Sequence, residues 1–181
     1  MPSSAEDISS SVHAVGTPAS SVTAHASDDE RHMRHALALA RAASRRDEVP
    51  VGSVAVRDGT VIAAAGNAME GRHDATAHAE MLVLRAASSV GGWRLHGVTL
   101  YVTLEPCPMC AGAMVQARID RCVYGARDPK KGADGSVYDV LRNPANNHAV
   151  SVTEGVLAAD CGVVLSEFFA ARRSARDVEK G

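Results

Sequence analysis

Residues 99–117, TLYVTLEPCPMCAGAMVQA, decide the fold. The segment 99–104 is a short apolar run with β-branched and aromatic residues, which predicts a buried strand. The segment 107–117 carries small residues along one side and predicts a helix that starts directly after the strand. Cys107 and Cys110 stand at the start of that helix, and residues three apart face the same way. Two thiol groups are therefore expected to converge near the end of the strand.

A histidine and a glutamate precede this stretch, in the order His78-Ala79-Glu80. They belong to residues 77–88, AHAEMLVLRAAS, which have helical composition. Residues two apart in a helix point roughly 200° away from each other, at about 100° per residue, so they share no lateral face. They can share a site only beyond the first turn, near the helix axis. The sequence therefore predicts a helix that begins at about Ala77, with Thr76 as its N-cap.

These side chains together predict metal chemistry. His78, Cys107 and Cys110 offer three soft or borderline ligands, a set that suits zinc and leaves the fourth tetrahedral position for water. The helix start favours the thiolate form of cysteine, because it carries partial positive charge and free N–H groups. Zinc lowers the pKa of water toward neutrality. Glu80, which is not a ligand, can then move protons to a ring nitrogen and a leaving amine, as hydrolytic deamination requires.

Each part of the pattern has a simpler explanation when taken alone. His-x-Glu is common by chance, with both side chains exposed at a helix start. A Cys-x-x-Cys pair also forms redox sites and structural zinc sites. Cys122 and Cys161 have no partner spacing and lie in apolar segments, so we expect them to be buried packing residues.

Helices and strands alternate along the rest of the chain. A capping box at residues 27–30 predicts a helix from there to about Ser44. Asp58-Gly59 supplies the positive φ angles of a tight turn, which predicts a hairpin over residues 52–66. A polar loop is expected over 67–76, strands over 121–124 and 149–153, and an amphipathic helix over about 158–174. Such interleaving predicts an α/β sheet with helices packed on its faces.

Composition bounds the class of protein. The chain has 181 residues, of which 46% are hydrophobic, and a net charge of −2, which fits one soluble domain. Residues 1–27 are predicted to be a disordered extension and residues 28–181 the folded domain. Four cysteines are too few for a disulfide scaffold, and no targeting segment or apolar run of membrane-spanning length is visible. We therefore expect a cytoplasmic protein without membrane contact.

His-x-Glu followed by Pro-Cys-x-x-Cys is the signature of the zinc-dependent nucleobase deaminases. Longer stretches closely resemble the bacterial tRNA-specific adenosine deaminases, over about residues 28–176. These stretches are VPVGSVAV (49–56), GRHDATAHAE (71–80), LYVTLEPCPMCAGAM (100–114), YGARDPKKGADGS (124–136) and EFFAARR (167–173).

The resemblance implies a fold, a reaction and partners. The fold would be a cytidine deaminase-like three-layer α/β/α sandwich with a central five-stranded mixed sheet. The reaction would convert adenosine to inosine at the wobble position of an arginine tRNA with an ACG anticodon. The implied cofactor is one Zn²⁺ per chain, and the implied partners are the anticodon stem-loop of tRNA and a second copy in a homodimer.

The resemblance also implies three substrate-binding residues. Asn67 would hydrogen-bond the base, Ala79 would present its backbone N–H in the pocket, and Asp128 would lie beside the target nucleotide. Without the resemblance, Asn67 is more simply a turn residue after a strand, and Asp128 is an ordinary loop acid.

Two other functions compete with this one. The same chemistry could act on a free base or nucleoside such as guanine or cytosine, but the basic residues of 118–131 and 172–176 favour RNA, since a free base needs no phosphate contacts. A non-enzymatic zinc module closed by Cys122 as a fourth ligand is the second alternative, and it leaves Glu80 without a role.

Overall fold

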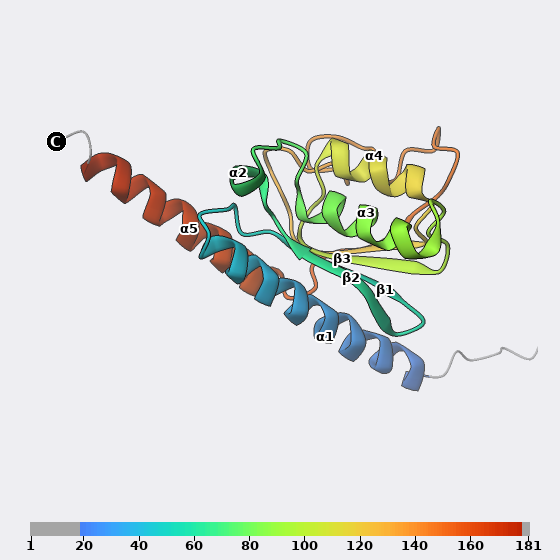
Figure 1. The fold of residues 1–181 in the computed structure, drawn as a ribbon. Coiled ribbons are helices and arrows are strands. Elements are labelled where there is room, and N and C mark those ends of the chain that lie inside the picture. The colour runs from blue at the N-terminus through green and yellow to red at the C-terminus, as the bar shows by residue number, and fades with distance from the viewer. Residues whose placement is uncertain (1–18, 179–181) are drawn as a thin grey trace, which may run out of the picture.

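A central sheet lies between two pairs of helices in the computed structural model, which describes residues 19–178 and the side chains of residues 27–176 (Figure 1). Helices α3 and α4 cover one face of the sheet, and α1 and α5 cover the other. The elements are α1 (Ala19–Ser44), β1 (Gly52–Arg57), β2 (Thr60–Gly66), α2 (Met69–Arg72), α3 (Ala79–Gly91), β3 (Val98–Leu104), α4 (Pro108–Ala117), β4 (Arg121–Ala126), β5 (Ser151–Thr153) and α5 (Ala158–Val178).

The sheet is mixed, with five strands in the order β2-β1-β3-β4-β5. Strand β1 runs antiparallel to β2 and β3, whereas β3, β4 and β5 are parallel to one another. Asp58 and Gly59 turn the predicted hairpin with φ angles of 50° and 73°. The predicted three-layer sandwich with a five-stranded mixed sheet is confirmed.

Alternating residues of the central strands supply two separate cores. Leu100 and Val102 pack with α3 and α4, whereas Tyr101 packs with α1 and Val123 on the opposite face. Helix α1 approaches the sheet so closely that a Cβ atom at Gly52 would lie 2.0 Å from a carbonyl oxygen of the helix. The layers are therefore fixed on both sides of β3, the strand that leads to the cysteine pair.

The predicted start of the first helix is wrong. Helix α1 begins at Ala19, so residues 27–30 lie inside it and do not form a capping box. Asp29 instead binds across to the sheet, where its carboxylate accepts the Tyr101 hydroxyl at 2.9 Å and two Arg121 N–H groups at 3.0 and 2.7 Å. An acid that looks like a helix start thus anchors the middle of a longer helix. The predicted disordered extension stays a prediction for residues 1–18, which lie outside the described residues.

Two smaller differences concern the rest of the chain. The loop over 67–76 contains the short helix α2, and α5 runs to Val178, beyond its predicted end. Cys122 and Cys161 are buried, as predicted. Over residues 19–178, no helix has both the length and the apolar character needed to cross a membrane.

Candidate active site

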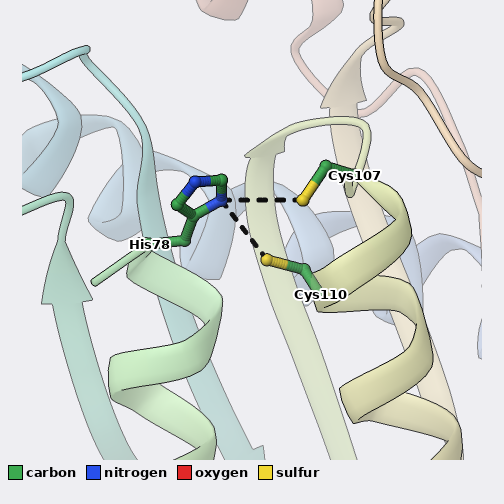
Figure 2. A group of neighbouring side chains, drawn as sticks. All are labelled: His78, Cys107 and Cys110. Carbon is green, nitrogen blue, oxygen red and sulfur yellow. Dashed lines mark hydrogen bonds between the residues drawn. The ribbon is translucent and has the colours of Figure 1, made fainter. Parts of the chain in front are cut away.

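The starts of two neighbouring helices meet at one point. Cys107 is the extended N-cap residue of α4, Pro108 opens the helix, and Cys110 lies in its first turn. His78 is the N-cap residue of α3, with φ −66° and ψ 149°. The side chains of His78, Cys107 and Cys110 point toward one another across the gap between the two helices (Figure 2).

The conformation of His78 explains how His78 and Glu80, only two residues apart, can face one site. Helix α3 begins at Ala79, two residues later than predicted. Thr76 is therefore not its N-cap residue, and its hydroxyl donates a hydrogen bond to Asp74 instead. Because His78 lies outside the helix in an extended conformation, the helical angle between positions two apart does not apply to it. His78 and Glu80 can therefore serve one site although both stand at the start of the same helix.

The distances within the cluster fit a tetrahedral metal ion. The Nδ1 atom of His78 lies 3.6 Å from the Cys107 sulfur and 3.5 Å from the Cys110 sulfur. Sulfur and nitrogen ligands at about 2.3 and 2.0 Å from zinc are roughly 3.5 Å apart when the angle is tetrahedral. All three ligand atoms lie within 4.8 Å of one another, and among the described residues no other such group of His, Cys, Asp or Glu occurs. Cys122 is not part of the cluster. A closed structural zinc site would need Cys122 as its fourth ligand, so the structure does not support that alternative.

The two thiols are inequivalent. Hydrogen bonds from Cys110 and then from His78 lower the pKa of Cys107 to about 4, against the opposing effect of burial. The bond to Cys107, followed by burial, raises the pKa of Cys110. The Cys107 bond also raises the pKa of His78. The pKa of Cys107 is therefore shifted in the direction of the thiolate form that a metal ligand needs.

Glu80 lies in the first turn of α3, with an exposed fraction of 4%. Its Oε2 atom is buried and accepts no hydrogen bond from the described residues. Burial raises the pKa of its carboxyl. A buried polar atom without a partner costs free energy, and such groups concentrate where catalysis uses them. Glu80 thus has the properties of a general acid–base residue next to the three ligands.

A cavity of about 630 Å³ contains this site and extends over the carboxyl ends of β3 and β4 to helix α5. Its walls bring together predicted residues from distant parts of the sequence. They include Asn67, His78, Glu80, Cys107, Asp128, Lys130 and Lys131, with Phe169 and Arg173 of α5 at the far side.

Asn67 lies on the cavity wall and is hydrogen-bonded to the backbone of the buried Ala79. Asn67 has an exposed fraction of 4%, and its Oδ1 atom accepts the backbone N–H of Ala79 at 2.8 Å. The Nδ2 group of Asn67 makes no hydrogen bond within residues 27–176, so it is available to a ligand. The structure thus directs the N–H of Ala79 at Asn67, whereas the sequence suggested that it is presented directly in the pocket.

Asp128 also lines the cavity and holds its own turn. Its Oδ1 atom accepts the backbone N–H groups of Lys130 and Lys131 at 2.9 and 3.2 Å. Both lysine side chains are left on the exposed side of the loop, facing the cavity. Asp128 thus lines the cavity that also holds His78 and Cys107, and its predicted place beside the target nucleotide stays a prediction.

Sequence reasoning missed two features of this cavity. Glu105, between the β3 strand and Pro106, is a buried carboxylate, and an acid placed between an apolar strand and a Pro-Cys pair was a usable signal. Phe169 lines the cavity although 43% of it is exposed, and Arg173 follows one helical turn later. An exposed aromatic next to an arginine on one helix face was the corresponding signal for α5.

Comparison with known proteins agrees with the geometry. Residues 27–173 match the MafB19-like deaminase family. The tRNA-specific adenosine deaminase of Bacillus subtilis (strain 168) is 49% identical over 142 residues, which cover 78% of this chain and 88% of that protein.

Two solved structures have the same fold. One comes from biochemical and structural studies of A-to-I editing by tRNA deaminases at the wobble position of transfer RNA; it has a TM-score of 0.72 and 48% identity, and the match covers 75% of this chain and 99% of that chain. The other, a protein in complex with 2,6-diaminopurine, has a TM-score of 0.67 and 27% identity, with coverage of 78% and 82%.

Proposed function

The chain belongs to the tRNA-specific adenosine deaminases, within the MafB19-like deaminase family, and from this membership we propose that it deaminates adenosine to inosine at the wobble position of tRNA. The observation that carries the proposal is the unpartnered Oε2 atom of Glu80 beside the cluster of His78, Cys107 and Cys110. The reaction is a hydrolysis: water adds at the amino-bearing carbon of adenine, the carbon–nitrogen bond breaks, and ammonia leaves.

The metal in this proposal is zinc, one ion per chain. His78, Cys107 and Cys110 would hold it, because their number, softness and separation match a catalytic site with three protein ligands. When bound, zinc supplies the acidity that lets water act as a nucleophile near neutral pH. The thiolate already favoured at Cys107 provides a first ligand for the incoming cation.

Glu80 moves the protons. Its carboxylate takes a proton from the attacking water and delivers protons to the ring nitrogen and to the departing amino group. Burial raises the pKa of this carboxyl, which makes it a better proton acceptor than an exposed glutamate. Because no hydrogen bond fixes Oε2, no existing interaction has to break before the transfer.

The pair of Asn67 and Ala79 would orient the base. The Ala79 N–H fixes Oδ1, which leaves the Nδ2 group to donate to an acceptor atom of adenine. Asp128, which lines the same cavity, would lie beside the target nucleotide. Lys130 and Lys131 are available to phosphate oxygens of the anticodon loop, because their side chains make no ion pair within residues 27–176.

Deamination of a free base is the alternative, and the similarity to a protein that binds 2,6-diaminopurine favours it. The cavity argues for RNA, since its outer wall combines Lys130, Lys131 and Arg173 with the exposed ring of Phe169. A nucleobase without phosphates uses none of the three cations, whereas an RNA loop uses both the cations and the ring.

The deciding experiment measures product formation by the zinc-loaded protein. A transcribed arginine tRNA with an ACG anticodon is incubated beside free adenosine, guanine and cytidine. We expect inosine in the tRNA and no conversion of the free compounds at the same concentration. Conversion of a free base at a rate equal to or above that of the tRNA contradicts the proposal. Sedimentation of the same sample tests the proposed homodimer, and fractionated cells test the proposed cytoplasmic location.

A further inference from the structure

Part of the cavity wall comes from the loop of residues 127–137, which we call the lysine loop. It contributes Arg127, Asp128, Lys130 and Lys131 to the lining. The loop has no regular secondary structure over most of its length, so its conformation depends on contacts with the rest of the fold.

The side chain of Glu105 supplies those contacts. Its exposed fraction is 2%, and no arginine, lysine or histidine pairs with it among the described residues. All its recorded donors come from the lysine loop. Oε2 accepts the backbone N–H of Asp128 at 3.0 Å and the Ser136 hydroxyl, and Oε1 accepts the N–H groups of Asp134 at 2.9 Å and Ser136 at 3.3 Å.

The backbone of the loop closes tightly around this carboxylate. A Cβ atom at Gly132 would lie 2.4 Å from the carboxyl group of Glu105 and 2.6 Å from the carbonyl oxygen of Asp128. The N–H of Ala133 also donates to the carbonyl oxygen of Pro106 at 2.9 Å. The loop is thus wrapped around a single acidic side chain that directly precedes the Pro-Cys pair.

We propose that Glu105 is a positioning residue for RNA binding, which holds the lysine loop so that Lys130 and Lys131 face the substrate. The proposal rests on the proposed tRNA substrate. This role explains why an acid occupies a wall that would face a polyanion. Four hydrogen-bond donors of the lysine loop compensate the negative charge of Glu105, and the same four bonds hold the loop in place.

Electrostatics and positioning predict opposite signs for the same substitution. Glu105→Gln removes a negative charge beside the proposed phosphate-binding lysines, which by charge alone strengthens RNA binding. If Glu105 positions the loop, the same change weakens binding, because the amide NH₂ of glutamine faces N–H donors and the loop moves. The measured sign therefore separates the two roles.

The experiment compares Glu105→Gln with a matched control, Asp29→Asn. Asp29 is also a buried carboxylate with hydrogen bonds from three donor groups, but it holds α1 to Tyr101 and Arg121, on the far face of the sheet. Both variants remove one buried anion and both lower thermal stability. A third variant, Ser136→Ala, removes one donor to Glu105 and tests the clamp if Glu105→Gln does not fold.

The readouts are bound zinc, kcat and KM for the tRNA, and amide hydrogen exchange without RNA. For Glu105→Gln we expect one zinc per chain, a KM increase on the order of tenfold with kcat within about threefold, and faster exchange at Asp128, Asp134 and Ser136. Ser136→Ala raises KM on the order of threefold. Asp29→Asn leaves KM and the exchange of these amides unchanged.

An unchanged or lower KM in both Glu105→Gln and Ser136→Ala overturns the proposal, and so does a KM increase of the same size in Asp29→Asn. Wild-type protein that forms no inosine in tRNA counts against the proposed function instead. In that case the exchange of the loop amides in Glu105→Gln still decides whether Glu105 holds the loop.

Discussion

Two buried glutamates line the same cavity and have opposite surroundings. Glu80 has an Oε2 atom without a hydrogen-bond donor, and burial raises the pKa of its carboxyl. Burial also acts on Glu105, but bonds from the Ser136 hydroxyl and three backbone N–H groups outweigh it and hold the pKa below its ordinary value. The difference teaches how to assign roles. A buried acid with an oxygen that lacks a donor can exchange protons there, whereas a buried acid whose two oxygens are surrounded by donors serves as a structural anchor.

Removal of a metal ligand has the largest expected effect, because Glu80 has no nucleophile to deprotonate without the ion. His78→Ala, Cys107→Ala and Cys110→Ala should each lose bound zinc and all measurable deamination, since two remaining ligands bind the ion poorly. Metal analysis together with the inosine assay checks this. A full complement of zinc in all three variants would show that the ligands have been assigned wrongly.

The convergence of the two cysteines was predictable from sequence, and the reason is local. Cys107 and Cys110 stand at a strand-to-helix junction whose pattern is visible within residues 99–117, and the converging thiols follow from helical spacing. His78 was identified by its motif, but its conformation was not. The sequence placed it inside a helix, and the structure makes it an extended N-cap residue.

Loss of the Asn67 amide, which we propose orients the base, should have the next largest effect. Asn67→Ala removes the Nδ2 donor and leaves the Ala79 N–H without its acceptor, so the start of α3 loses one hydrogen bond beside Glu80. We expect kcat/KM to fall on the order of 100-fold with zinc retained, since orientation at the reacting atoms is disturbed. Steady-state kinetics on the tRNA measure it, and a change of less than about threefold contradicts the role of Asn67.

The two glutamates should also differ in how their substitution changes the free energy of unfolding. Glu105→Gln leaves loop N–H groups without an acceptor and should lower the free energy of unfolding by about 1–3 kcal/mol. Glu80→Gln breaks no hydrogen bond at Oε2 and removes a buried charge, so the stability of the zinc-loaded protein should stay equal or rise. Chemical denaturation of both zinc-loaded variants at the same pH measures their free energies of unfolding and tests this difference. Equal losses in both would abolish the distinction drawn between them.

What the sequence did not show depends on contacts between distant segments. The donors that surround Glu105 come from residues 128–136, so the local pattern of an acid between an apolar strand and a Pro-Cys pair could mark its position but not its role. The role of Asp29 was predicted wrongly for the same reason. Its neighbours in the sequence resemble a capping box, whereas its partners Tyr101 and Arg121 lie far along the chain. The hairpin turn at Asp58-Gly59 was predictable, since its backbone angles are set by the two residues themselves.

The central claim is that Glu80 moves protons and does not hold the metal. Its most direct test is the rate of inosine formation in the arginine tRNA by Glu80→Gln, measured at one bound zinc per chain. The account predicts that zinc stays bound and that turnover falls by about 10²-fold to 10⁴-fold or more. A decrease of about 10²-fold to 10⁴-fold is the usual contribution of a general acid–base group. Turnover within about tenfold of the wild-type rate, with zinc bound, contradicts the claim.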